Sequence, residues 1–164
     1  MRTDDTARSL AHLFSELVDG VTSSQGGFVL NQGDIGLTKS LDHLSAEDAS
    51  RSTNDGATIA AHAQHVRYGL SLMNEWAAHG GNPFANAKWD EAWKIKAVGD
   101  DQWKEIRKGL ADEAHRWNEV LKTPREATGI EFTGLMSSIA HLAYHLGAIR
   151  QIHKHTRGPK EGTF

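Results

Sequence analysis

The sequence of 164 residues contains no cysteine. This absence excludes thiolate zinc sites, iron–sulfur clusters, disulfide bonds and a cysteine nucleophile. It also fits a reducing compartment, and the charged N-terminal stretch MRTDDTARSL lacks the apolar region of a signal peptide. We therefore expect a cytoplasmic protein.

Long apolar runs and an excess of positive charge are also missing. No run approaches the roughly 18 apolar residues that a membrane span needs, so we expect no membrane partner. The formal net charge is -3, whereas nucleic-acid-binding proteins usually carry a basic patch or stripe. We therefore expect no nucleic-acid partner.

The remaining composition is that of a globular domain. Hydrophobic residues make up 38% and charged residues 24%, and a chain of this length can bury a full core without disulfides or a structural metal. We predict a single domain over residues 1–164, in which the polar tail 156–164, with its Gly and Pro, is flexible.

Four segments repeat apolar residues at steps of three and four, the pattern of amphipathic helices. They cover about residues 5–18, 57–79, 101–122 and 128–152. Thr128 and Glu131 have the spacing of a capping box, which marks the start of the last helix. No segment alternates with the period of two that is typical of strands. The sequence therefore predicts an all-α protein.

Two of the links between these helices are long. Residues 21–54 contain two short predicted helices, near 37–43 and 46–51, and residues 80–100 carry two tryptophans. A structureless loop of this length is uncommon in a compact domain unless it is functional. We predict a four-helix bundle with long crossover connections.

Histidine and tryptophan are unusually abundant, with ten and five copies. His141 and His145 lie about 40° apart on one side of a helix, next to its apolar stripe. Neutral imidazoles in a core need partners for their nitrogens, and a metal ion would satisfy one nitrogen of each. His153 and His155 lie beyond the stripe, so we expect them in solvent. The five tryptophans predict a core or pocket lined with aromatic rings.

The helix over 57–79 offers a third ligand. His62 and His65 both lie near its apolar side, about 60° apart, and the spacing does not choose between them. Three imidazoles from two helices leave an open position, as in catalytic metal sites. Such a set suits zinc, nickel and iron. Alternatively, a carboxylate from one of the crossovers supplies a fourth ligand.

Other well-known sites are absent from the sequence. It has no P-loop, no G-x-G-x-x-G, no G-x-S-x-G and no Glu-x-x-His, so nucleotide binding by those loops, serine hydrolysis and a di-iron carboxylate bundle are not expected.

Two histidine motifs resemble those of the DinB/YfiT-like superfamily of metal-binding four-helix bundles. They are His65-Val66, six residues after Ile59, and HLAYHLGAI over residues 141–149. Relatives often carry Trp in the second link, where this chain reads KWDEAW. Leu146 and Ala148 differ from the polar residues of many relatives.

The resemblance implies a right-handed, up-down-down-up bundle that binds a divalent metal, commonly zinc or nickel. It implies His65, His141 and His145 as ligands, and His62 as a residue that contacts a ligand from behind or packs beside it. Characterised relatives include transferases and isomerases that use bacillithiol, mycothiol or glutathione, and dimers are common among them. Gly147, two residues past a ligand, predicts either a close approach of another helix or ordinary tight packing.

Together these features predict a metal-dependent enzyme that acts on a small-molecule substrate. A thiol-dependent S-transferase or isomerase, or a hydrolase, fits the resemblance, with a low-molecular-weight thiol as a cofactor candidate. Tyr68 is a candidate orienting group or weak acid, and Arg150 a candidate for binding an anionic group. The alternative is a non-catalytic bundle that binds a metal or small ligand and acts as a homodimeric interaction module.

Overall fold

The computed structural model describes residues 3–21, 26–153 and 156. Regular structure in this part of the chain is helical, apart from one isolated bridge between Gly20 and Ile35. The elements are α1 (Thr3–Asp19), α2 (Leu37–Asp42), α3 (Ala46–Ala49), α4 (Ile59–His79), the 3₁₀ helix η1 (Ala92–Lys94), α5 (Asp100–Lys122) and α6 (Gly129–Ile152). The all-α prediction is therefore confirmed.

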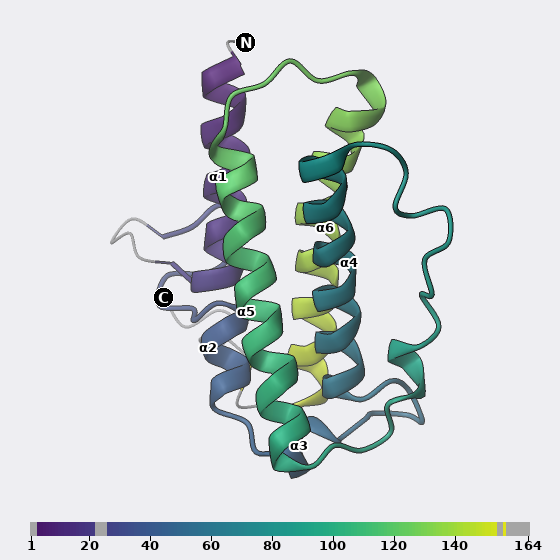
Figure 1. Ribbon diagram of the computed structural model, residues 1–164. Helices are drawn as coiled ribbons and strands as arrows, with labels where there is room; N and C mark the ends of the chain where they lie inside the picture. Colours follow the sequence, from purple (N-terminus) through teal and green to yellow (C-terminus); the bar gives the residue numbers. More distant parts are fainter. Residues whose placement is uncertain (1–2, 22–25, 154–155, 157–164) are drawn as a thin grey trace.

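The four long helices lie side by side in a ring, in which α1 contacts α5 and α6, and α4 contacts the same two helices. In Figure 1, α1 and α6 run downward, whereas α4 and α5 run upward. Antiparallel α4 and α6 are therefore neighbours on one side of the ring. Within the described residues, no helix is long and apolar enough to cross a bilayer.

The predicted apolar stripes face the middle of the ring. Trp103 and Trp117 of α5 and Phe14 of α1 are among the largest fully buried side chains. The indole nitrogens find acceptors, because Trp103 donates to the Leu44 carbonyl (2.8 Å) and Trp117 to the Ser138 hydroxyl (2.9 Å). Burial of these rings therefore leaves no indole N–H unpaired.

Local signals fix where the helices begin and end. Thr128 and Glu131 form the predicted capping box at the start of α6, and the Thr58 hydroxyl caps α4 by accepting from the Ala61 amide. Gly20 follows α1 with a φ of +94°, and an added Cβ there would lie 2.6 Å from the Asp34 carbonyl oxygen. Glycine is therefore required where the chain leaves α1.

The first crossover is held against α1 by a buried carboxylate. Glu16 accepts hydrogen bonds from the amides of Phe28, Val29 and Leu30 at 2.6–2.8 Å. Burial alone would raise the pKa of Glu16, but these three amides, together with His12, lower it below its ordinary value. The charged side chain thus serves as an anchor for backbone 28–30.

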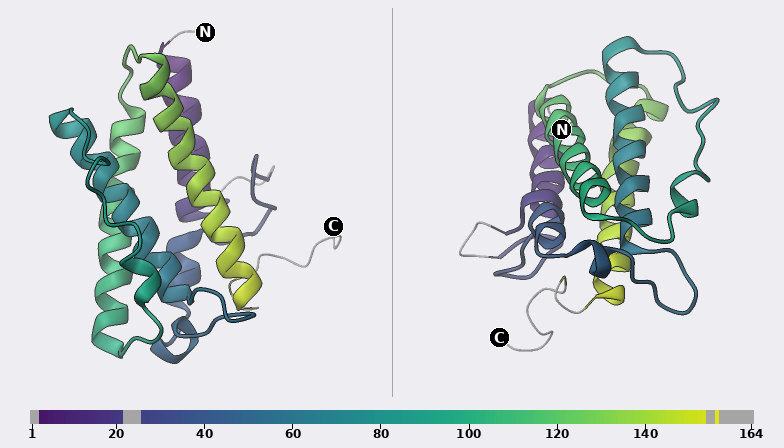
Figure 2. Two further views of the ribbon diagram at one scale, coloured as in Figure 1. Left: turned by 90° about the vertical axis from the view of Figure 1, so that its right-hand side faces the viewer. Right: turned by 60° about the horizontal axis from the view of Figure 1, so that its bottom comes forward.

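The second crossover, residues 80–99, runs along the outer side of α4, as the left view of Figure 2 shows. Three hydrogen bonds attach it to the body. The Lys88 amide donates to the Tyr68 hydroxyl (3.0 Å), the Thr58 hydroxyl donates to the Ile95 carbonyl (2.9 Å), and the Val98 amide donates to the Ser50 hydroxyl (3.0 Å). This link therefore carries its aromatic residues to the face of α4.

One expectation for the C-terminal region is wrong. His153 is buried, and its Nε2 lies 3.1 Å from an Asp48 carboxylate oxygen of α3, so the chain beyond the stripe turns back onto the bundle. Thr156 is also buried, and its hydroxyl donates to the His153 carbonyl (2.6 Å). His155 and residues 157–164 lie outside the described residues.

Gly147 is exposed, and a Cβ added to it would meet nothing within 4 Å. Neither a close approach of another helix of this chain nor tight packing therefore explains this glycine.

Candidate metal centre

Three histidines from α4 and α6 bring their Nε2 atoms together. His141 Nε2 lies 3.0 Å from His65 Nε2 and 3.0 Å from His145 Nε2. His65 and His145 are buried and His141 is half-buried. Among the described residues, this is the one group of three or more metal-ligating side chains whose ligand atoms lie within 4.8 Å of one another.

Hydrogen bonding among the three rings does not satisfy these nitrogens. A neutral imidazole nitrogen carries either one proton or one lone pair. His141 Nε2 faces two partners at once, so its single proton or lone pair cannot serve both well. One cation, in contrast, accepts the lone pairs of all three nitrogens.

The spacing also fits a metal ion. Two nitrogens bound to one zinc at tetrahedral geometry lie about 3.4 Å apart. The observed separations of 3.0 Å are within a few tenths of an ångström of that value. Two of the three separations are therefore close to the value expected at a metal, and the ligand atoms of all three residues lie within 4.8 Å of one another, so the group can hold a divalent metal.

The surroundings keep these histidines uncharged. Burial, with a smaller effect from the neighbouring imidazoles, lowers the pKa of His65 to about 4 and that of His145 to about 3. Burial also lowers the pKa of His141 and of His62. At neutral pH the rings thus offer lone pairs, which metal binding requires.

His62 lies behind His145 and away from the three Nε2 atoms. Its Nδ1 is 2.9 Å from His145 Nδ1. If His145 uses Nε2 for a metal, its Nδ1 carries the proton and donates it to His62, which fixes the tautomer of the ligand. His65 Nδ1, by comparison, is buried without a hydrogen-bond partner in the described part of the chain. The structure therefore places His65 at the centre and His62 beside it.

Two tryptophans of the second crossover cover the ligands. The Trp93 ring stacks on His65 with centroids 4.4 Å apart, and it contacts His62 edge-on at 5.5 Å. Trp89 packs against His65, with centroids also 5.5 Å apart. The sequence predicted a core or pocket lined with aromatic rings, but it did not connect Trp89 and Trp93 with the histidines. The spacing of four between the two tryptophans in KWDEAW is the sequence feature from which their common position could have been predicted.

Tyr68 and Arg150 hold crossovers in place. The Tyr68 hydroxyl accepts from the Lys88 amide, and its ring lies 5.5 Å from Trp89. The Arg150 guanidinium donates to a carboxylate oxygen of buried Asp34 (2.9 Å) and to the Ile35 carbonyl (3.1 Å). Tyr68 thus reaches the metal centre through Trp89, whereas these two hydrogen bonds join Arg150 to the first crossover.

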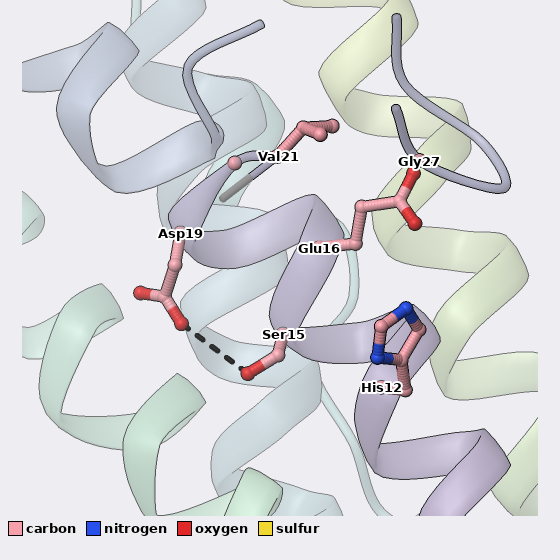
Figure 3. A pocket seen from close by; sticks show the side chains of 7 residues that line it. His12, Ser15, Glu16, Asp19, Val21 and Gly27 are labelled. Atoms are coloured by element: carbon pink, nitrogen blue, oxygen red, sulfur yellow. Dashed lines mark hydrogen bonds between the residues drawn. The ribbon is translucent and has the colours of Figure 1, made fainter. Parts of the chain in front are cut away.

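A second group of polar residues lies at the end of α1, and Figure 3 shows that its side chains do not converge. The Asp19 carboxylate accepts from the Ser15 hydroxyl at 3.4 Å. Glu16 is directed to backbone 28–30, as described above. The pocket that these polar residues line at the end of α1 therefore does not form a metal site.

Comparison of the chain with protein-family models, curated proteins and solved structures gave no significant match.

Proposed function

We propose that the protein is a divalent-metal-dependent enzyme of the DinB/YfiT-like type that acts on a small molecule. The observation that carries this proposal is the convergence of three uncharged Nε2 atoms from α4 and α6. The helix directions support the same type of bundle, because α1 and α6 run one way and α4 and α5 the other.

In this proposal His65, His141 and His145 hold the ion. Zinc and nickel are the first candidates, and iron is also suited to imidazole ligands. When bound, the ion supplies a Lewis acid with a position open to water or substrate. His62 orients the His145 ring by accepting its Nδ1 proton, and Trp93 shields the His65 ring from solvent.

Two reaction types suit such a centre: hydrolysis and transfer of a low-molecular-weight thiol. In a thiol transfer, the thiol gives its proton to water, its sulfur bonds to an electrophilic carbon, and the leaving group departs from that carbon with the electrons of the broken bond. The resemblance to thiol-dependent transferases favours the second type. The thiol cofactor, a homodimer and a cytoplasmic location rest on that resemblance and on composition.

Tyr68 remains the candidate for a polar group near the substrate. Its hydroxyl accepts from the Lys88 amide, so its own proton is free to be donated. We leave Arg150 out of the proposed mechanism, because its guanidinium already binds Asp34 and the Ile35 carbonyl.

Metal analysis of protein purified without a histidine tag tests the proposal. We expect about one divalent ion per chain in the wild type, and a loss of at least tenfold in His65→Ala, His141→Ala and His145→Ala, because two imidazoles hold a metal weakly. His79→Ala is a matched control, since His79 is an exposed histidine of α4. Unchanged metal content in all three ligand variants would falsify the site.

A panel of thiol-transfer and hydrolysis substrates then separates the two candidate functions. We expect turnover by the metal-loaded wild type and none by His141→Ala. If the wild type binds metal fully but turns over no substrate of the panel, the non-catalytic binding bundle becomes the better description.

A further inference from the structure

Two adjacent pockets on the α4–α6 side of the ring share lining residues and form one groove that ends at His141, one of the three candidate metal ligands. The inner pocket, of about 310 Å³, is lined by His141. The outer pocket, of about 530 Å³, extends to Ile130 at the start of α6. Both pockets are lined by Met73, Phe84 and Gly134, so they meet at these residues.

The groove has the size of a site for an elongated small molecule. Ile130 and His141 lie eleven positions apart on α6, which at a rise of 1.5 Å per residue corresponds to about 16 Å. The combined pockets lie in the range of about 300–1,000 Å³ that is typical of ligand sites.

The walls of the groove are mostly apolar, and Asn82, Thr133, Ser137 and Ser138 add polar side chains. Met73 and Trp76 come from α4, Phe84 and Trp89 from the second crossover, and Ile130 from α6. Trp89 is 37% exposed and Ile130 is 79% exposed, so these large apolar side chains face water in the free protein. Covering them with an apolar ligand would be favourable.

Charge in the groove does not favour an ionic occupant along its length. Among the described residues that line the two pockets, Glu131 is the one with an acidic or basic side chain besides His141, whose pKa burial lowers. Its carboxylate accepts from the Thr128 amide (2.7 Å) and the Thr128 hydroxyl (2.8 Å), so it is engaged in the capping box. The occupant is therefore expected to be uncharged away from the metal.

We propose that the groove binds an uncharged, elongated apolar tail of a substrate whose head group lies at the histidine centre. The continuity of the groove with His141 supports a single amphipathic molecule as the occupant. This inference deepens the proposed function and relies on it for the head group, but the tail site stands on the shape and chemistry of the groove.

Binding of n-alkyl hydroxamic acids with two to ten carbons, measured by calorimetry on the zinc-loaded full chain, tests the tail site. The hydroxamate head binds zinc, and only the tail varies along the series. We expect the affinity to rise about threefold to fourfold per methylene until the tail fills the groove. The matched n-alkyl amides, which lack the metal-binding head, should show the same dependence on length at lower affinity.

Gly134→Phe should remove this dependence. A Cβ added to Gly134 would meet only the Met73 methyl, at 3.9 Å, so a larger side chain fits the helix but occupies the junction of the two pockets. We expect unchanged affinity for the two-carbon hydroxamate and a loss of at least tenfold for the ten-carbon one. Gly147→Phe is the matched control, because it makes the same change on the exposed outer side of α6. If Gly134→Phe does not fold, Gly134→Leu replaces it as the variant that fills the junction.

The possible results separate the tail site from the metal centre. Affinity that does not depend on tail length, or that falls equally in both glycine variants, overturns the tail site even when hydroxamates bind. Equal affinity of hydroxamates and amides, with a persisting length dependence, overturns the metal head site and leaves the tail site standing. A wild-type dimer in sedimentation velocity that Gly134→Phe dissociates would mean that a second copy fills the groove, and would also overturn it.

Discussion

His62 and His65 differ in role although they lie three positions apart on α4. His65 directs its Nε2 atom to Nε2 of His141, whereas His62 directs its Nδ1 atom to Nδ1 of His145. Helical spacing alone could not separate them, because both lie near the apolar side of the helix, and it was the resemblance to the DinB/YfiT-like motif that implied His65. The difference in role between His62 and His65 comes from the position of the His141–His145 pair on α6. The spacing of four between His141 and His145, in contrast, already predicted that these two share one face.

Replacing His62 should weaken metal binding without abolishing it. In His62→Ala, the Nδ1 proton of His145 loses its acceptor, and loss of such outer contacts typically costs 10–100-fold in metal affinity. Competition with a chromophoric chelator measures this change. His79→Ala should retain wild-type affinity. A complete loss of metal in His62→Ala, together with full retention in His65→Ala, would show that the assignment on α4 is reversed.

At the scale of elements, the helices followed from the sequence, including the two short ones of the first crossover, α2 and α3, whereas the contacts of the crossovers did not. Apolar residues at helical spacing and the Thr128–Glu131 capping box are local signals, so they can be recognised without knowing the fold. The stacking of Trp93 on His65, the burial of His153 against Asp48 and the role of Glu16 all join residues far apart in the chain. No periodicity marks such contacts in a single sequence.

Glu16→Gln should detach the first crossover from α1. The amide replaces one acceptor oxygen with a donor that faces backbone N–H groups, so we expect a loss of about 2 kcal/mol in the free energy of unfolding. Chemical denaturation at neutral pH measures this loss. Glu47→Gln is the control, since the Glu47 side chain is 89% exposed.

The pH dependence of that loss provides a check on its cause. Folding lowers the pKa of Glu16 below 4.5, so its contribution to stability is present above that pH and disappears as the pH falls through the folded-state value. The difference between wild type and Glu16→Gln should therefore shrink in acid. A difference that stays constant down to pH 3 would contradict the role of the charge.

At the scale of the whole molecule, the histidine centre joins α4 to α6 across one side of the ring. An ion that binds only the folded state stabilises it by about 2.7 kcal/mol when its concentration is 100 times the dissociation constant. For a chain of this length, that corresponds to an increase of about 5–10 °C in the melting temperature. Thermal denaturation with and without added zinc should show this increase in the wild type and in His79→Ala. An equal increase in His141→Ala would place the stabilising ion elsewhere.

The group that can hold a metal contains three uncharged imidazoles and, among the described residues, no carboxylate. Neutral ligands offset none of the ion's charge, so a divalent ion there would retain its full two positive charges. An uncompensated charge in a poorly solvated site is costly. The open position would therefore prefer an anion to a neutral molecule of the same shape, and the centre would select its partners by charge balance. Small anions should then compete with the substrate.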